Sequence, residues 1–142
     1  MSRGHRELPH TADVYLEVYA PNLDQAFEEA GVALFEVMTD TSKVSAKLTH
    51  RFRIDAEDLH SLLFDYVREL LYLVDAEEYL FSEFKVRIRK IKGTYTLSAI
   101  VKGEKIDRGR HLTKTEIKAP TYAQMEIIES EKEVILRFVV DI

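Results

Sequence analysis

The chain has 142 residues, 46% of them hydrophobic and 32% charged, a composition that excludes a disordered or fibrous protein and predicts one compact domain over residues 1–142. The formal net charge of −5 disfavours tight RNA binding by the surface as a whole, and the absence of cysteine excludes disulfides, thiolate metal sites and cysteine nucleophiles. No apolar segment approaches the roughly 18 residues that span a membrane, so we expect a cytoplasmic protein with no membrane partner.

The first predicted elements are a strand and a helix. Apolar and polar residues alternate from Asp13 to Ala20, which is typical of a half-buried strand. Pro21 ends this strand, and Asn22 is suited to cap the helix that follows. Apolar residues recur at helical spacing from Leu23 to Met38, so this helix should lie on a sheet.

A second strand and a second helix follow. Alternation returns from Lys43 to Ile54 and predicts a strand. Asp55 then stands where a helix N-cap belongs, and Glu57 and Asp58 favour the positive end of a helix dipole. A wide apolar stripe from Leu59 to Val74 predicts the helix itself.

The remaining sequence has mostly strand patterns. Two alternating runs, Phe84–Arg89 and Tyr95–Val101, flank a Lys92-Gly93 turn and predict a hairpin. Residues 103–114 form a polar loop, after which 115–128 and 133–140 predict a final pair of strands. The segment 77–82 is a candidate joint between two subdomains.

This order predicts the fold class. A strand, a helix, a strand, a helix and then a run of strands favour an α+β fold in which two helices pack on a mainly antiparallel sheet. A doubly wound parallel fold is disfavoured, because it would need strands and helices to alternate throughout.

Two anionic groups are expected at the end of the last strand. The apolar alternation runs to Val140, so the Asp141 side chain and the carboxylate of Ile142 should be held side by side. Asp13 stands at the mouth of the first strand and points away from the predicted core. If these strands are neighbours, the three groups form a hard oxygen cluster suited to Ca²⁺, Mg²⁺ or Mn²⁺; a solvated Asp13 and a solvated terminus are the alternative.

Two further groups have functional and non-functional interpretations. Asp65 interrupts the second helix off its apolar stripe, which a solvated helix surface explains equally well. The loop 108–111 and Lys118 could bind a phosphate or an acidic partner, although a solvent-facing loop is favoured. The sequence has no glycine-rich phosphate loop, GxSxG elbow or HExxH helix, and this absence disfavours a familiar class of enzyme.

The motifs together closely resemble the archease family, and the resemblance runs nearly from end to end. It is carried, in chain order, by His10-Thr11-Ala12-Asp13, by Leu34-Phe35-Glu36-Val37-Met38-Thr39-Asp40, by DYVRELLYL at 65–73, by Gly103-Glu104 through Asp107 to Arg110-His111, by Glu116-Ile117-Lys118-Ala119 and by Asp141-Ile142.

The resemblance implies an accessory protein and not an enzyme. It implies that the chain assists the GTP- and metal-dependent tRNA-splicing RNA ligase by promoting guanylylation of the ligase's active-site histidine and multiple turnover. The ligase is the expected partner and tRNA an indirect one, and direct contact with RNA or nucleotide is left open. Asp13, Asp141 and Ile142 match the family's metal-binding positions, with Ca²⁺ expected first, and Asp65 and Lys118 match positions that look important for activation. Pro120 and Ala123 depart from the pattern, which puts in doubt any role for side chains of that strand.

Two other functions remain as hypotheses. One is a general chaperone or scaffold for nucleic-acid-processing enzymes, in which the acidic groups only mimic phosphate. The other is a metal-dependent hydrolase, which is disfavoured because the sequence offers no identifiable base beside the carboxylates.

Overall fold

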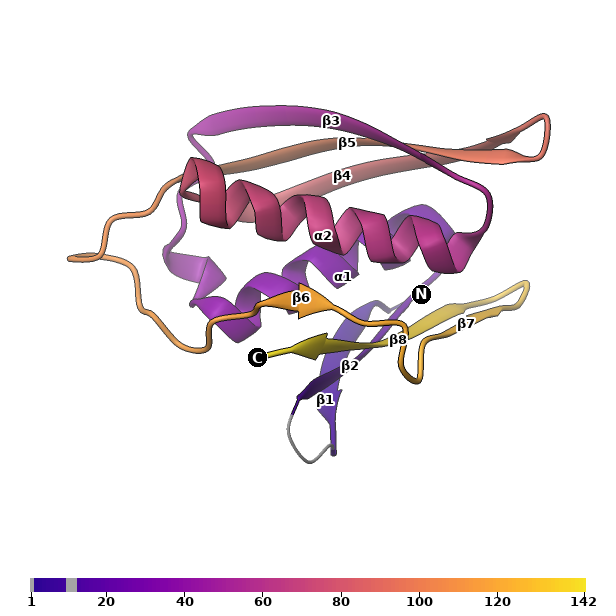
Figure 1. Ribbon diagram of the computed structural model, residues 1–142, viewed down its shortest axis with the longest axis horizontal. Helices are drawn as coiled ribbons and strands as arrows, with labels where there is room; N and C mark the ends of the chain where they lie inside the picture. The colour runs from indigo at the N-terminus through magenta and orange to yellow at the C-terminus, as the bar shows by residue number, and fades with distance from the viewer. Residues whose placement is uncertain (1, 10–12) are drawn as a thin grey trace.

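The computed structural model describes residues 2–9 and 13–142. Its element bounds are β1 Gly4–Leu8, β2 Val14–Ala20, α1 Leu23–Met38, a 3-10 turn η1 Thr41–Lys43, β3 Leu48–Ala56, α2 Leu59–Glu77, β4 Tyr79–Ile91, β5 Thr94–Lys105, β6 Ala119–Pro120, β7 Glu126–Glu129 and β8 Val134–Asp141. The described helices α1 and α2 lie in a layer between two sheets (Figure 1).

Both sheets are antiparallel throughout their described pairings. The five-stranded sheet has the order β1-β2-β8-β6, with β7 also paired to β8, and the three-stranded sheet has the order β3-β5-β4. The predicted α+β class is therefore confirmed, with the strands divided between two sheets instead of one.

The core fills the space between the helices and the inner faces of the sheets. Phe27 and Phe35 on α1, Tyr66 on α2, Phe81 on β4 and Phe138 on β8 are all fully buried. The Phe35 ring packs against both Phe81 and Phe84, at centroid distances of 5.7 and 5.6 Å. Aromatic burial on this scale ties both sheets to the same helix layer.

The first helix begins as its sequence predicts, whereas the second begins later. Asn22 is the N-cap of α1, and its side chain accepts a hydrogen bond from the Gln25 N–H. Asp58, and not Asp55, caps α2 by accepting from the Ser61 N–H at 2.7 Å. Asp55 belongs to β3 instead, because that strand pairs with β5 as far as Ala56.

Two strand predictions need correction, and one strand was not predicted. Residues 43–47 precede β3 as the end of η1 and a coil, because alternation makes a strand only where a partner strand is available. Most of 115–128 is irregular: only Ala119–Pro120 and Glu126–Glu129 pair, and between them a turn places Gln124 at a φ of 54°. The strand β1 was not predicted, since its five residues carry little apolar alternation.

The hairpin is longer than its alternation predicted, and the candidate joint is absent. Strand β4 starts at Tyr79, directly after the left-handed Glu78 that ends α2, so residues 79–82 are strand. Gly103 lies opposite Phe81, where an added Cβ would come within 1.8 Å of the Leu80 carbonyl oxygen. Glycine is required there by the close approach of the two backbones. None of the helices in the described residues is long and apolar enough to cross a membrane.

Candidate functional site

The first and last long strands are neighbours, which the sequence left open. In β2 and β8, Val14 lies opposite Val140. Asp13 and Asp141 are the next residues at the same end of this ladder, and both are half-buried. The pairing therefore gathers two acidic residues, followed by Ile142, at one end of the five-stranded sheet; we call Asp13, Asp141 and Ile142 the rim.

Lys118 reaches the same end from the other side of β8. Its backbone N–H donates to the Asp141 carbonyl oxygen at 2.7 Å, and Ala119 lies opposite Asp141 in the β6–β8 ladder. Because β8 lies between β2 and β6, Asp13 and Lys118 flank Asp141 on opposite sides. Lys118 itself is exposed.

Asp65 lies on α2 beside the segment that carries Lys118. Its carboxylate accepts from the Arg68 guanidinium at 2.8 Å. Arg68 and Phe64 line one wall of a shallow pocket of about 230 Å³, and Lys118 and Pro120 line the other. Asp65 is thus linked to the Lys118 segment through Arg68, while the Phe64 ring stacks on Tyr122 at 4.2 Å and holds α2 against this segment.

The donors of the rim suit a hard divalent cation only as part of a larger ligand set. Within residues 2–9 and 13–142, no group of three or more His, Asp or Glu side chains could hold a metal ion. The rim offers two such side chains, Asp13 and Asp141, and the main-chain carboxylate of Ile142 stays a prediction as the third anionic group. His10, in the motif with Asp13, lies outside the described residues.

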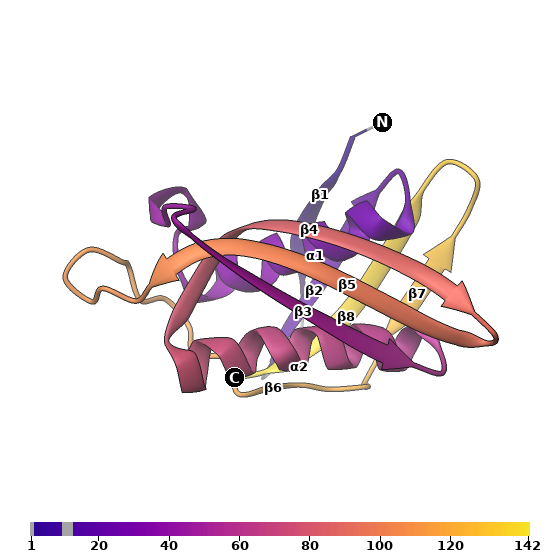
Figure 2. The ribbon, with the colours of Figure 1, turned by 90° about the horizontal axis from the view of Figure 1, so that it is seen from above.

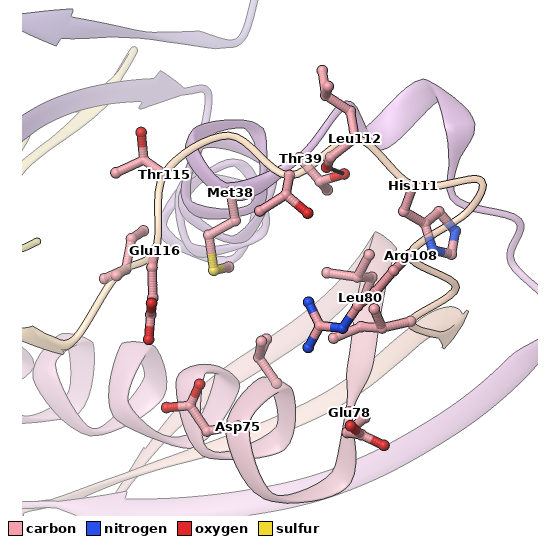
Figure 3. A pocket seen from close by; sticks show the side chains of 14 residues that line it. Met38, Thr39, Asp75, Glu78, Leu80, Arg108, His111, Leu112, Thr115 and Glu116 are labelled. Carbon is pink, nitrogen blue, oxygen red and sulfur yellow. Dashed lines mark hydrogen bonds between the residues drawn. The ribbon is translucent and has the colours of Figure 1, made fainter.

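A second hollow lies between α2 and the loop after β5 (Figure 3). Its volume is about 250 Å³, and the Arg108 side chain points into it, with Asp75, Glu78 and Glu116 around the opening. Burial and the nearby Glu116 raise the pKa of Asp75. Asp75 also lines the shallow pocket beside Lys118, so the two hollows meet at this residue.

The loop 106–118 is anchored by a buried ionic cluster that the sequence did not predict. Glu104, only 5% exposed, accepts hydrogen bonds from Arg110 at 2.5 Å, from the Ser45 N–H at 2.6 Å and from His111 at 3.0 Å. These donors, the Arg110 guanidinium first, lower the pKa of Glu104 from its usual 4.5 to about 2.

His111 belongs to this cluster and not to a solvent-facing loop. Its Nδ1 accepts from the Asp107 N–H at 2.9 Å, which assigns the proton to Nε2, the atom that faces Glu104. Both ring nitrogens are therefore occupied, and His111 is not placed to bind a phosphate. The sequence signal for burial is weak, since basic residues surround His111 on the chain.

The fold and the site define an α+β protein whose described helices α1 and α2 lie between antiparallel sheets and whose acidic groups Asp13 and Asp141 gather at one sheet end. This class has a known family: the chain belongs to the Archease protein family, whose model matches residues 5–142. The resemblance recognised from the sequence motifs is thereby confirmed.

Individual relatives agree over nearly the whole chain. A curated protein archease of Sulfurisphaera tokodaii is 46% identical over 94% of each chain. One of Methanosarcina barkeri is 40% identical over 99% of this chain and 97% of its own. The solution structure of protein 1598 of Methanobacterium thermoautotrophicum superposes with a TM-score of 0.87 at 40% identity, covering 98% of this chain and 99% of that one.

Proposed function

We propose that this chain is an accessory protein of a tRNA-splicing RNA ligase. It promotes guanylylation of the ligase's active-site histidine and so allows multiple turnover, while making no RNA bond itself. Membership of the Archease family supports an archease role in general terms. The observation that supports a rim-based mechanism is the β2–β8 pairing, which brings Asp13 and Asp141 to the same end of one ladder.

The rim would hold the divalent cation. Asp13, Asp141 and the carboxylate of Ile142 supply hard oxygen donors, which Ca²⁺, Mg²⁺ and Mn²⁺ prefer. Ca²⁺ takes about six to eight oxygen ligands, so coordination positions remain for water or for groups of a bound partner. When bound, the cation supplies concentrated positive charge to a surface that is otherwise acidic.

Strand pairing explains why these residues would act together. Holding two carboxylates at adjacent ladder ends raises their mutual repulsion, and a cation relieves that repulsion. The hydrogen bond from the Lys118 N–H to the Asp141 carbonyl oxygen fixes the Lys118 backbone beside the rim. We assign Lys118 and Asp65 to contact with the ligase during activation.

Ligation under limiting ligase tests this function. A broken tRNA is joined by the partner ligase with GTP and Mn²⁺, with and without this protein. Wild type is expected to raise the number of turnovers per ligase. The gain in turnovers given by Asp141→Ala should be at least about tenfold smaller, which is the scale expected when a metal site loses a group. Glu131→Ala is the matched control, because Glu131 lies exposed in the β7–β8 turn.

A separate measurement avoids the ligase's own metals. Titration calorimetry with Ca²⁺ and the chain alone should show one site in wild type and in Glu131→Ala, and none in Asp141→Ala. If Asp13→Ala and Asp141→Ala both activate the ligase as wild type does, the rim mechanism is wrong. Activation that persists without metal binding would instead support a general chaperone or scaffold.

A further inference from the structure

The outer face of the three-stranded sheet is open and strongly basic. Helices cover the inner face of β3, β5 and β4, whereas the opposite face points away from the molecule (Figure 2). We call this surface the basic face. Its cationic side chains, all exposed, are Arg51, Arg53, Lys85, Arg87, Arg89 and Lys102.

The strand register arranges these cations in rows across the sheet. Arg51 and Lys85 lie on either side of Ile100 in β5, and Arg53 and Arg87 lie on either side of Ser98. Two more rows lie beyond these, one at each end. One row contains Arg89 and the acid Asp55, and the other contains Lys102 and the acid Glu83. The rows repeat every two residues, or about 6.7 Å along the strands, so four rows extend over roughly 20 Å.

Most of this positive charge is not neutralised within the molecule. Arg53 contacts Asp55 at 3.4 Å, a long and exposed pair. Within the described part of the chain, Arg51, Lys85, Arg87, Arg89 and Lys102 make no salt bridge. Six cations against two acids on one face therefore leave a local positive field, although the whole chain carries −5.

A hollow runs along the β4 edge of this face. It has a volume of about 740 Å³ and is lined by Lys85, Arg87 and Arg89 on one side and by the start of α1 on the other. The wall also holds two acids of α1, whose carboxylates face the backbone of β4. Asp24 accepts a hydrogen bond from the Ile88 N–H at 3.0 Å, and Glu28 accepts one from the Val86 N–H at 2.9 Å. The basic side chains thus overhang a concave edge.

The chemistry of the basic face favours a polyanion over a folded protein partner. Specific protein interfaces centre on buried apolar or aromatic anchors. The outward positions of β5 are Thr96, Ser98, Ile100 and Lys102, which include no aromatic residue and only one apolar one. Without a ring on which bases could stack, contacts would be made to phosphates and would be independent of sequence.

We propose that the basic face binds the phosphate backbone of RNA. The choice of RNA over other nucleic acids rests on the proposed ligase function. The binding of a phosphate backbone as such rests only on the charge and shape of the basic face. The face belongs to β3–β5–β4, and the rim to the other sheet across the helix layer (Figure 1). One molecule could therefore hold RNA on one side while its rim meets the ligase on the other.

Fluorescence anisotropy with a labelled RNA duplex of about 20 base pairs, in the absence of ligase, tests the proposal. Each neutralised phosphate contributes about −0.9 to the slope of log K against log salt, so roughly four contacts predict a slope between about −3 and −4. The double variant Lys85→Gln/Arg87→Gln should bind at least about tenfold more weakly at low salt, and its slope should be shallower by about 2.

A matched variant separates this local effect from net charge. Lys43→Gln/Lys132→Gln removes the same two charges at exposed positions outside the basic face and should bind within about twofold of wild type. Ser98→Glu places a negative charge between Arg53 and Arg87 without deleting a cation, and should also weaken binding. Circular dichroism checks that each variant is folded.

Three outcomes would overturn the proposal. These are the absence of salt-dependent RNA binding by wild type, an equal loss in the face and control variants, and tighter binding of polyglutamate than of RNA. The last would assign the face to an acidic protein. The rim variant Asp141→Ala should bind the duplex as wild type does, so failure of RNA binding and failure of ligase activation are separate results.

Discussion

At the scale of single residues, Glu104 has the most strongly perturbed environment among the described acids. It is buried, it accepts hydrogen bonds from Arg110, His111 and the Ser45 backbone, and its pKa is lowered to about 2. These bonds tie the start of the loop 106–118 to the coil before β3. The loop that leads to Lys118 is therefore fixed by a carboxylate that is itself far from the rim in sequence.

Replacing this carboxylate should expose its pH dependence. Glu104→Gln is expected to lower the free energy of unfolding at pH 7 by about 1.5–3 kcal/mol, because hydrogen bonds to a charged group are lost. A lowered folded-state pKa stabilises the protein above the usual 4.5, and this stability is lost as pH falls toward 2.

The measurement is urea unfolding of wild type and Glu104→Gln at several pH values. The difference in the free energy of unfolding between wild type and Glu104→Gln should narrow steadily as the pH falls below about 4.5. Glu131→Gln, a change at an exposed turn residue, should track wild type throughout. A gap that stays constant to low pH would show that the charge of Glu104 is not what stabilises the loop.

At the scale of elements, α1 closes an edge of the three-stranded sheet. The outer N–H groups of Val86 and Ile88 on β4 would otherwise be unpaired, and the carboxylates of Glu28 and Asp24 accept from them. Edge strands that keep such groups open are templates for aggregation. The helix thus protects β4 on one side while β5 pairs with it on the other.

Removing one of these carboxylates should loosen the edge. Glu28→Ala leaves the Val86 N–H without its acceptor, so we expect a loss of about 1–3 kcal/mol in the free energy of unfolding. Amide hydrogen exchange at Val86 should accelerate, while exchange in β2 stays close to wild type. Glu83→Ala, at an exposed position of the same strand, is the control. If amide exchange at Val86 accelerates equally in Glu83→Ala, Glu28 does not cap this edge.

Sequence patterns predicted the elements unequally well. Asn22 was recognisable as a cap because one capping residue precedes one periodic apolar run. Before α2, Asp55, Glu57 and Asp58 all lie within four residues, and only the pairing of β3 with β5 shows that the strand continues to Ala56. Strand β1 likewise depends on its partner β2, which no local pattern could reveal.

At the scale of the whole molecule, the rim joins the chain's first and last long strands. A cation bound there would link β2 to β8 and stabilise only the folded state. At a Ca²⁺ concentration about 100 times the Kd, the free energy of unfolding should rise by about 2.7 kcal/mol. Differential scanning calorimetry with and without Ca²⁺ should show this as a higher Tm for wild type and no change for Asp141→Ala. An equal shift in the variant would place the cation elsewhere.

The sequence by itself determined the α+β class, both helices, the hairpin and the family, because periodicity, capping and motif order are local properties of the chain. Only the tertiary structure decided that β2 lies beside β8, that His111 is buried on Glu104 and that six cations share one open face. The physical reason is that strand order and register bring together residues far apart in the sequence. A net charge of −5, likewise, describes the sum of the charges and not their segregation onto separate faces.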